Sequence, residues 1–124
     1  MIAVDDWRDD LLRAMEIAAR IEDRLEALKN TRDAAKRIGN EKLFVEASLW
    51  IPPLMRIRES LYRIADQLEK GLKVPASIEA CKLSKSIRVL LNDVRKSSLN
   101  PVISPLEADL REAYRFLAAL CISS

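Results

Sequence analysis

Apolar residues recur at helical spacing along most of the chain, and glycine, proline or asparagine separates the stretches. The first stretch alternates spacings of three and four from about Asp6 to Ile38, which predicts one long amphipathic helix. The chain has only two glycines, Gly39 and Gly71, and each follows the end of such a stretch. Because glycine accepts the left-handed backbone that closes a helix, both positions are expected to be helix ends joined by short turns.

A second helix is predicted from about Glu41 to Lys70, with Asn40 as its N-cap. The turn before it is so short that the helix must return antiparallel to the first. Pro52 and Pro53 lack amide donors and clash with the preceding turn, so we expect the helix to be kinked or broken at this pair.

Two further helices complete the pattern. The third is predicted from about Ala76 to Lys96, with Ile78, Cys81, Ile87, Leu90, Leu91 and Val94 facing inward. The fourth is predicted to start with Ser104 as N-cap, Pro105 in the first helical position and Glu107 completing a capping box. Since no segment shows strand alternation, the sequence predicts an all-α, up-down-up-down four-helix bundle that forms a single domain over residues 1–124.

The sequence offers little for catalysis. It contains no histidine, the commonest general base and metal ligand, and no glycine-rich phosphate loop. Glu22 and Glu26 are spaced to share a hard cation, which makes a magnesium-dependent enzyme one possible function. It is the weakest of the three functions that we consider. Most acids instead stand one turn from a base, which is typical of a solvated helix face. We therefore expect a non-enzymatic protein with no cofactor, no metal site and no small-molecule substrate.

The two cysteines, Cys81 and Cys121, lie among apolar neighbours and are far apart in the chain. This pattern favours buried free thiols in a reducing compartment, although a single bridge between them is the alternative. The acidic N-terminus lacks the basic and apolar regions of a secretory signal, and no uncharged segment approaches the ~20 residues that a membrane span needs. The sequence therefore predicts a cytoplasmic protein with no membrane association.

Charge is distributed unevenly along the chain. The segment from Leu54 to Lys96 has a net charge of +5, whereas the rest of the chain has −3. Four basic residues of the third helix fall near one face and form a candidate phosphate-contacting surface: Lys85, Arg88, Arg95 and Lys96. The alternative is a solvated face beside an acidic first helix, and no aromatic residue interleaves the bases to stack on nucleotides.

Apolar coverage on the first, second and fourth helices is wider than one bundle contact requires. We interpret the surplus as a surface for a second copy or for a protein partner, and the alternative is a central position of these helices in the bundle. The candidate interface comprises Trp50, Ile51, Leu54, Met55, Phe116, Leu117, Leu120 and Ile122. The sequence thus predicts a protein–protein interaction or assembly module that is a homo-oligomer or binds a protein partner. The alternative function is a small nucleic-acid-binding accessory subunit.

Overall fold

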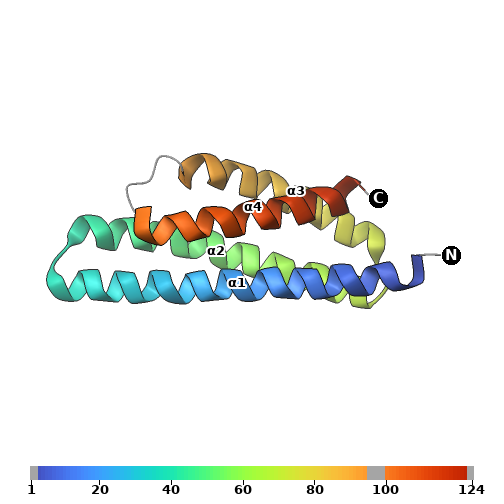
Figure 1. Cartoon of the computed structure of the whole chain (residues 1–124), viewed down its shortest axis with the longest axis horizontal. Helices are drawn as coiled ribbons and strands as arrows, with labels where there is room; N and C mark the ends of the chain where they lie inside the picture. The colour runs from blue at the N-terminus through green and yellow to red at the C-terminus, as the bar shows by residue number, and fades with distance from the viewer. Residues whose placement is uncertain (1–2, 95–99, 123–124) are drawn as a thin grey trace.

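Four antiparallel helices make up the computed structural model, which describes residues 3–94 and 100–122 (Figure 1). They are α1 (Ala3–Ile38), α2 (Glu41–Glu69), α3 (Lys73–Val94) and α4 (Asn100–Ile122). No strand occurs in these described ranges. The predicted all-α four-helix bundle is therefore confirmed.

Both glycine turns have the predicted conformation, because Gly39 and Gly71 each have φ of +75°. After α1, the amide of Asn40 donates to the Ala35 carbonyl at 2.9 Å and that of Gly39 to the Lys36 carbonyl at 3.3 Å. This pair of bonds satisfies carbonyls that a helix end leaves without partners. The Asn40 side chain then accepts a bond from the Leu43 amide at 3.1 Å, so its predicted role as N-cap of α2 is confirmed.

The predicted break at Pro52-Pro53 is wrong, because α2 runs through both prolines as one helix. The pair removes two amide donors, but Trp50, Ile51 and Leu54 beside it are buried and hold this segment against the core. A bend of the helix axis at the prolines stays a prediction.

The start of the last helix also differs from the prediction. Helix α4 begins at Asn100, so Ser104 is not its N-cap and Pro105 lies inside the helix. The physical reason is that Pro101 occupies the first turn, where a missing amide donor is harmless, and so can take the initiating role that we assigned to Pro105.

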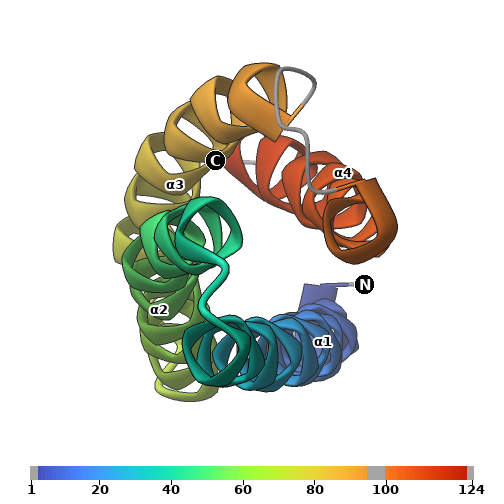
Figure 2. The same cartoon turned by 90° about the vertical axis from the view of Figure 1, so that its left-hand side faces the viewer.

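The core lies along the axis of the bundle, between the four helices. Figure 2, seen along the bundle, shows α1, α2, α3 and α4 arranged in sequence order around this axis. The largest side chains of the core with no more than 2% exposure include Ile21, Leu25, Leu54, Ile87 and Leu110. The predicted inward position of Ile78 is wrong, since this side chain is 51% exposed. Helix α3 instead turns Ala76, Ala80 and Leu83 inward.

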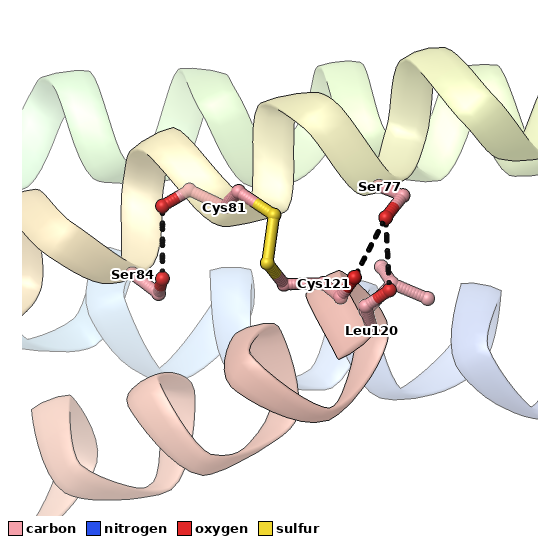
Figure 3. The surroundings of a disulfide bond; sticks show 5 residues. All are labelled: Ser77, Cys81, Ser84, Leu120 and Cys121. Carbon is pink, nitrogen blue, oxygen red and sulfur yellow. Dashed lines mark hydrogen bonds between the residues drawn. A yellow bond between two sulfur atoms is a disulfide. The ribbon is translucent and has the colours of Figure 1, made fainter. Parts of the chain in front are cut away.

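A disulfide joins Cys81 of α3 to Cys121 of α4, with the two Cα atoms 4.9 Å apart (Figure 3). The expectation of free thiols is therefore wrong. The cysteines are 40 residues apart in sequence, but the antiparallel α3–α4 hairpin brings them level. Beside the bridge, the Ser77 hydroxyl donates to the carbonyl oxygens of Leu120 and Cys121 at 3.1 and 3.2 Å (Figure 3). The end of α4 is thus fastened to α3 by a covalent bond and by a cap on its last carbonyls.

Candidate functional site

The described helices form a groove between α1 and α4 and a smaller one between α2 and α3. This α1–α4 groove has a volume of about 720 Å³. Its lining is largely charged and includes Arg13 and Arg20 of α1 with Asp109, Glu112, Arg115 and Phe116 of α4. A groove with this composition could receive a polar ligand only if its charges were free to bind one.

Most of these charges are already paired across the groove. Glu112 accepts bonds from both Arg13, at 2.8 Å, and Arg20. Asp109, whose side chain is only 14% exposed, accepts a bond from Arg24 at 2.8 Å. The arginines recur at spacings of seven and four on α1, opposite two carboxylates three residues apart on α4. We interpret this groove as an ion-paired seam that closes the bundle.

The second groove lies between α2 and α3 and has a volume of about 420 Å³. We call it the α2–α3 groove. Buried Ile57 and Leu83 form its floor, and Pro53, Leu90 and the 61% exposed Val89 flank them. Half of its lining residues are apolar and the others are polar or charged, whereas charged side chains dominate the α1–α4 groove.

The apolar surface continues along α2 beyond the groove. Val45 and Leu49 are 52% and 67% exposed, and exposed Pro52 follows them on the same face. Their spacing of four and then three continues to Arg56 in the groove, so these side chains lie in one row. The row extends the groove with an exposed aliphatic strip at the amino-terminal half of α2.

Basic side chains stand at the other end of this surface. Arg56 and Lys82 line the groove from its two helices, and Lys85 is exposed one turn further along α3. Within the described ranges, none of these three forms an ion pair. The nearby Arg63 does form an ion pair, because its guanidinium lies 3.3 Å from a carboxylate oxygen of Glu79 across the groove. The α2–α3 groove therefore combines an exposed apolar end with a polar end, where Arg56 and Lys82 form no ion pair among the described residues and Glu79 is paired with Arg63.

Most of the predicted interface residues belong to the core of a single chain. Trp50, Ile51, Leu54, Leu117 and Leu120 are at most 8% exposed, which corrects their assignment to an intermolecular surface. The ring order of the four helices explains the difference, because a helix between two neighbours buries a wider apolar face than a helix with one.

The remaining predicted interface residues do not form one surface. Met55 and Phe116 are half-buried against the core, and Phe116 also lines the α1–α4 groove. The side chain of Ile122 lies outside the described residues. Whether the chain associates with itself stays a prediction, but these residues no longer support it.

The predicted phosphate-contacting face is described only in part. Lys85 and Arg88 are exposed on α3, whereas Arg95 and Lys96 lie outside the described residues. Exposed Ile78 and Val89 flank Lys82 and Lys85 in one row on this helix. Such a mixed surface is less typical of a phosphate-binding stripe than a continuous row of bases would be.

The sequence contained a signal for the α2–α3 groove that our interpretation missed. Val45, Leu49, Pro52 and Arg56 repeat at helical spacing on a second face of α2, off the core stripe.

Of the two candidate magnesium ligands, Glu22 is engaged by side chains of α2. Glu22 accepts bonds from Arg58 at 3.1 Å and from the Tyr62 hydroxyl at 3.4 Å.

The described residues contain no group of three or more metal-ligating side chains placed to hold an ion. No helix among them is long and apolar enough to cross a bilayer.

Comparison of this chain with known protein families, with curated proteins and with solved structures found no match.

Proposed function

We propose that this chain is a non-enzymatic interaction module that binds a helix of a protein chain in the α2–α3 groove. One observation carries the proposal: exposed aliphatic side chains and unpaired bases meet along the same groove. Leu49 and Val89 are each more than 60% exposed, and Arg56 and Lys82 lack ion pairs within the described residues. Leaving contiguous apolar side chains in water is unfavourable, so such a surface favours a partner.

The dimensions and chemistry suit recognition of an amphipathic helix. A bound helix presents anchors at spacings of three and four, which can cover Leu49 and Val89. Carboxylates about two turns further along that helix would reach Arg56 and Lys82. Apolar contact would supply most of the affinity, and the charge pairs would fix the orientation of the helix.

Binding of designed peptides tests this function. One helical peptide would carry leucines at one end of a face and glutamates at the other, and a second would carry lysines in place of the glutamates. Backbone amide shifts of the labelled protein report where each peptide binds. We expect the acidic peptide to shift α2 and α3 residues at the groove, to bind at least tenfold more tightly than the basic peptide, and to lose affinity with salt.

A matched pair of variants locates the binding. Arg56→Glu should weaken binding of the acidic peptide, whereas Arg115→Glu, an equal charge change in the α1–α4 groove, should leave it unchanged. Binding of neither peptide, or equal effects of the two variants, would contradict the proposal.

The second candidate function is nucleic-acid binding, which the exposure of Lys85 and Arg88 on α3 favours. Duplex DNA and structured RNA would then bind with an affinity that falls steeply with salt, and glutamate at Arg88 would flatten that dependence. No binding above background at low salt would leave the helix-binding function as the only proposal.

The cytoplasmic location expected from the sequence stays a prediction. The Cys81–Cys121 disulfide weighs against it, because such bonds persist mainly in oxidising compartments.

A further inference from the structure

The outer face of α1 carries exposed apolar side chains followed by charged ones, as the α2–α3 groove does. The charged side chains of α1 are acidic, whereas those of the groove are basic. Leu12 and Met15 are 62% and 49% exposed, and exposed Ala19 continues their row one turn later. Asp23 and Glu26 follow on the same side of the helix and are exposed as well. In the described part of the chain neither of these two acids forms an ion pair. We call residues 12–26 of this face the α1 stripe.

The lengths of the two surfaces agree. Met15 and Asp23 are eight residues apart, which is about 12 Å along a helix, and Leu49 and Arg56 are seven residues apart, which is about 10 Å. Each surface therefore changes from apolar to charged over nearly the same distance. The α1 stripe can cover the aliphatic end of the groove while its carboxylates reach the basic end.

We propose that the helix bound in the α2–α3 groove is the α1 stripe of a second copy of this chain. The inference rests on the proposed helix-binding function and names its partner. Matching apolar ends and opposite charges fix the direction, so the bound α1 runs parallel to the α2 that it contacts. Within one chain α1 and α2 are antiparallel, and the contact is therefore made between chains.

The stripe and the groove use different residues, so the contact is heterologous. Two copies that exchange α1 stripes reciprocally close as a dimer, and copies that pass the contact onward form an open chain. Sedimentation velocity separates these cases, because a dimer reaches a limiting mass as concentration rises and an open chain does not.

Charge exchange tests the proposal. One variant carries Asp23→Lys and Glu26→Lys in the stripe, and another carries Arg56→Glu and Lys82→Glu in the groove. Each alone should lower the association constant of the full-length protein at least tenfold. Mixing the two should restore association, because the basic stripe of the first now fits the acidic groove of the second.

The controls change charge elsewhere on the same helices. Asp9→Lys lies on α1 outside the stripe, and Glu69→Lys lies at an exposed position near the end of α2, on the side of that helix opposite Arg56. Both should leave the association constant within about twofold of the wild type. Circular dichroism of every variant must show the wild-type helix content, so that a loss of association is not a loss of folding.

Three results would overturn the inference: a wild-type chain that stays monomeric to millimolar concentration, association that ignores both charge variants, or a mixture that does not recover. The designed acidic peptide separates these failures from failure of the proposed function. If the chain is monomeric but the peptide still binds the groove, the function stands and the partner is a different protein. If the peptide does not bind either, both proposals fail.

Discussion

The α1–α4 and α2–α3 grooves are built from the same kinds of helices and yet have opposite chemistry. In the α1–α4 groove, arginines of one helix meet carboxylates of the other, and Glu112 alone accepts bonds from two arginines. In the α2–α3 groove, the bases Arg56 and Lys82 have no such partner in the described part of the chain, and apolar side chains make up half of the lining.

The difference separates charge used inside the fold from charge left for a partner. An ion pair between two helices of one chain is satisfied without any ligand, whatever the size of the groove around it. The larger groove is therefore the weaker candidate, because its volume surrounds side chains that already bind one another. The smaller α2–α3 groove has exposed aliphatic side chains and bases without ion pairs, so a partner can bury or pair more of its surface than in the α1–α4 groove.

The largest expected effect concerns how α4 is held over the α1–α4 groove. Replacing both Cys81 and Cys121 by serine opens a loop of 40 residues, and chain entropy predicts a loss of about 4 kcal/mol in the free energy of unfolding. Denaturant titration of the oxidised wild type and the double variant measures it. Hydrogen exchange should rise more in α4 than in α2, because the bridge joins the end of α4 directly to α3.

Reductant provides the control for this prediction. It should destabilise the wild type and leave the double serine variant unchanged. A difference of less than about 1 kcal/mol between the two oxidised proteins would show that packing alone holds α4, against the entropic account.

The second effect concerns the prolines beside the α2–α3 groove. Pro52→Ala restores an amide donor to the Ser48 carbonyl, and a helix-interior proline costs about 3 kcal/mol. Because Pro52 is exposed, little packing is lost, and we expect the free energy of unfolding to rise by about 2–3 kcal/mol. Pro53→Ala should give a smaller gain, since Pro53 is half-buried and lines the groove. No gain at Pro52 would indicate that the helix axis already bends to relieve the proline.

Much of this fold follows from the sequence because its signals are local. Gly39, Asn40 and Gly71 end and start helices by backbone conformation and short-range hydrogen bonds, and all three act as predicted. One error, the start of α4, came from choosing Pro105 over the nearby Pro101, whereas two others occurred where distant residues decide. Neither the continuity of α2 through Pro52-Pro53 nor the Cys81–Cys121 bridge can be derived from nearest neighbours.

The candidate site was harder to predict for the same reason. Wide apolar coverage shows that a helix buries more than one face, but it does not show whether another helix of the chain or a partner covers the second face. Trp50 and Leu117 proved to be core, whereas Leu49 and Val89 are exposed. Only the arrangement of the helices places Arg56 beside Lys82 and separates both from the paired arginines of α1.

A third, smaller effect tests whether the α1–α4 groove is a structural seam. Glu112→Gln removes the charge that Arg13 and Arg20 share, and because all three side chains are partly exposed we expect a loss of about 0.5–1 kcal/mol in the free energy of unfolding. The loss should shrink in 1 M salt, where screening is strong. Glu59→Gln, at an exposed acid with no ion pair among the described residues, should change little at either salt concentration. A loss that does not depend on salt would mean that Glu112 acts through packing.

The smallest effect on stability is expected at the exposed aliphatic side chains in the α2–α3 groove and in the row that extends it. Leu49→Ser and Val89→Thr should each change the free energy of unfolding by less than about 0.5 kcal/mol, because both side chains are more than 60% exposed. The matched control is Leu54→Ala on the same helix, which removes a fully buried side chain and should cost about 2–5 kcal/mol. The groove variants should nevertheless weaken self-association, since water would replace the apolar contact with the α1 stripe. A loss of more than 1 kcal/mol from Leu49→Ser would show that this side chain contributes to the core. The α2–α3 groove would then lack the exposed apolar surface that distinguishes it from the ion-paired α1–α4 groove.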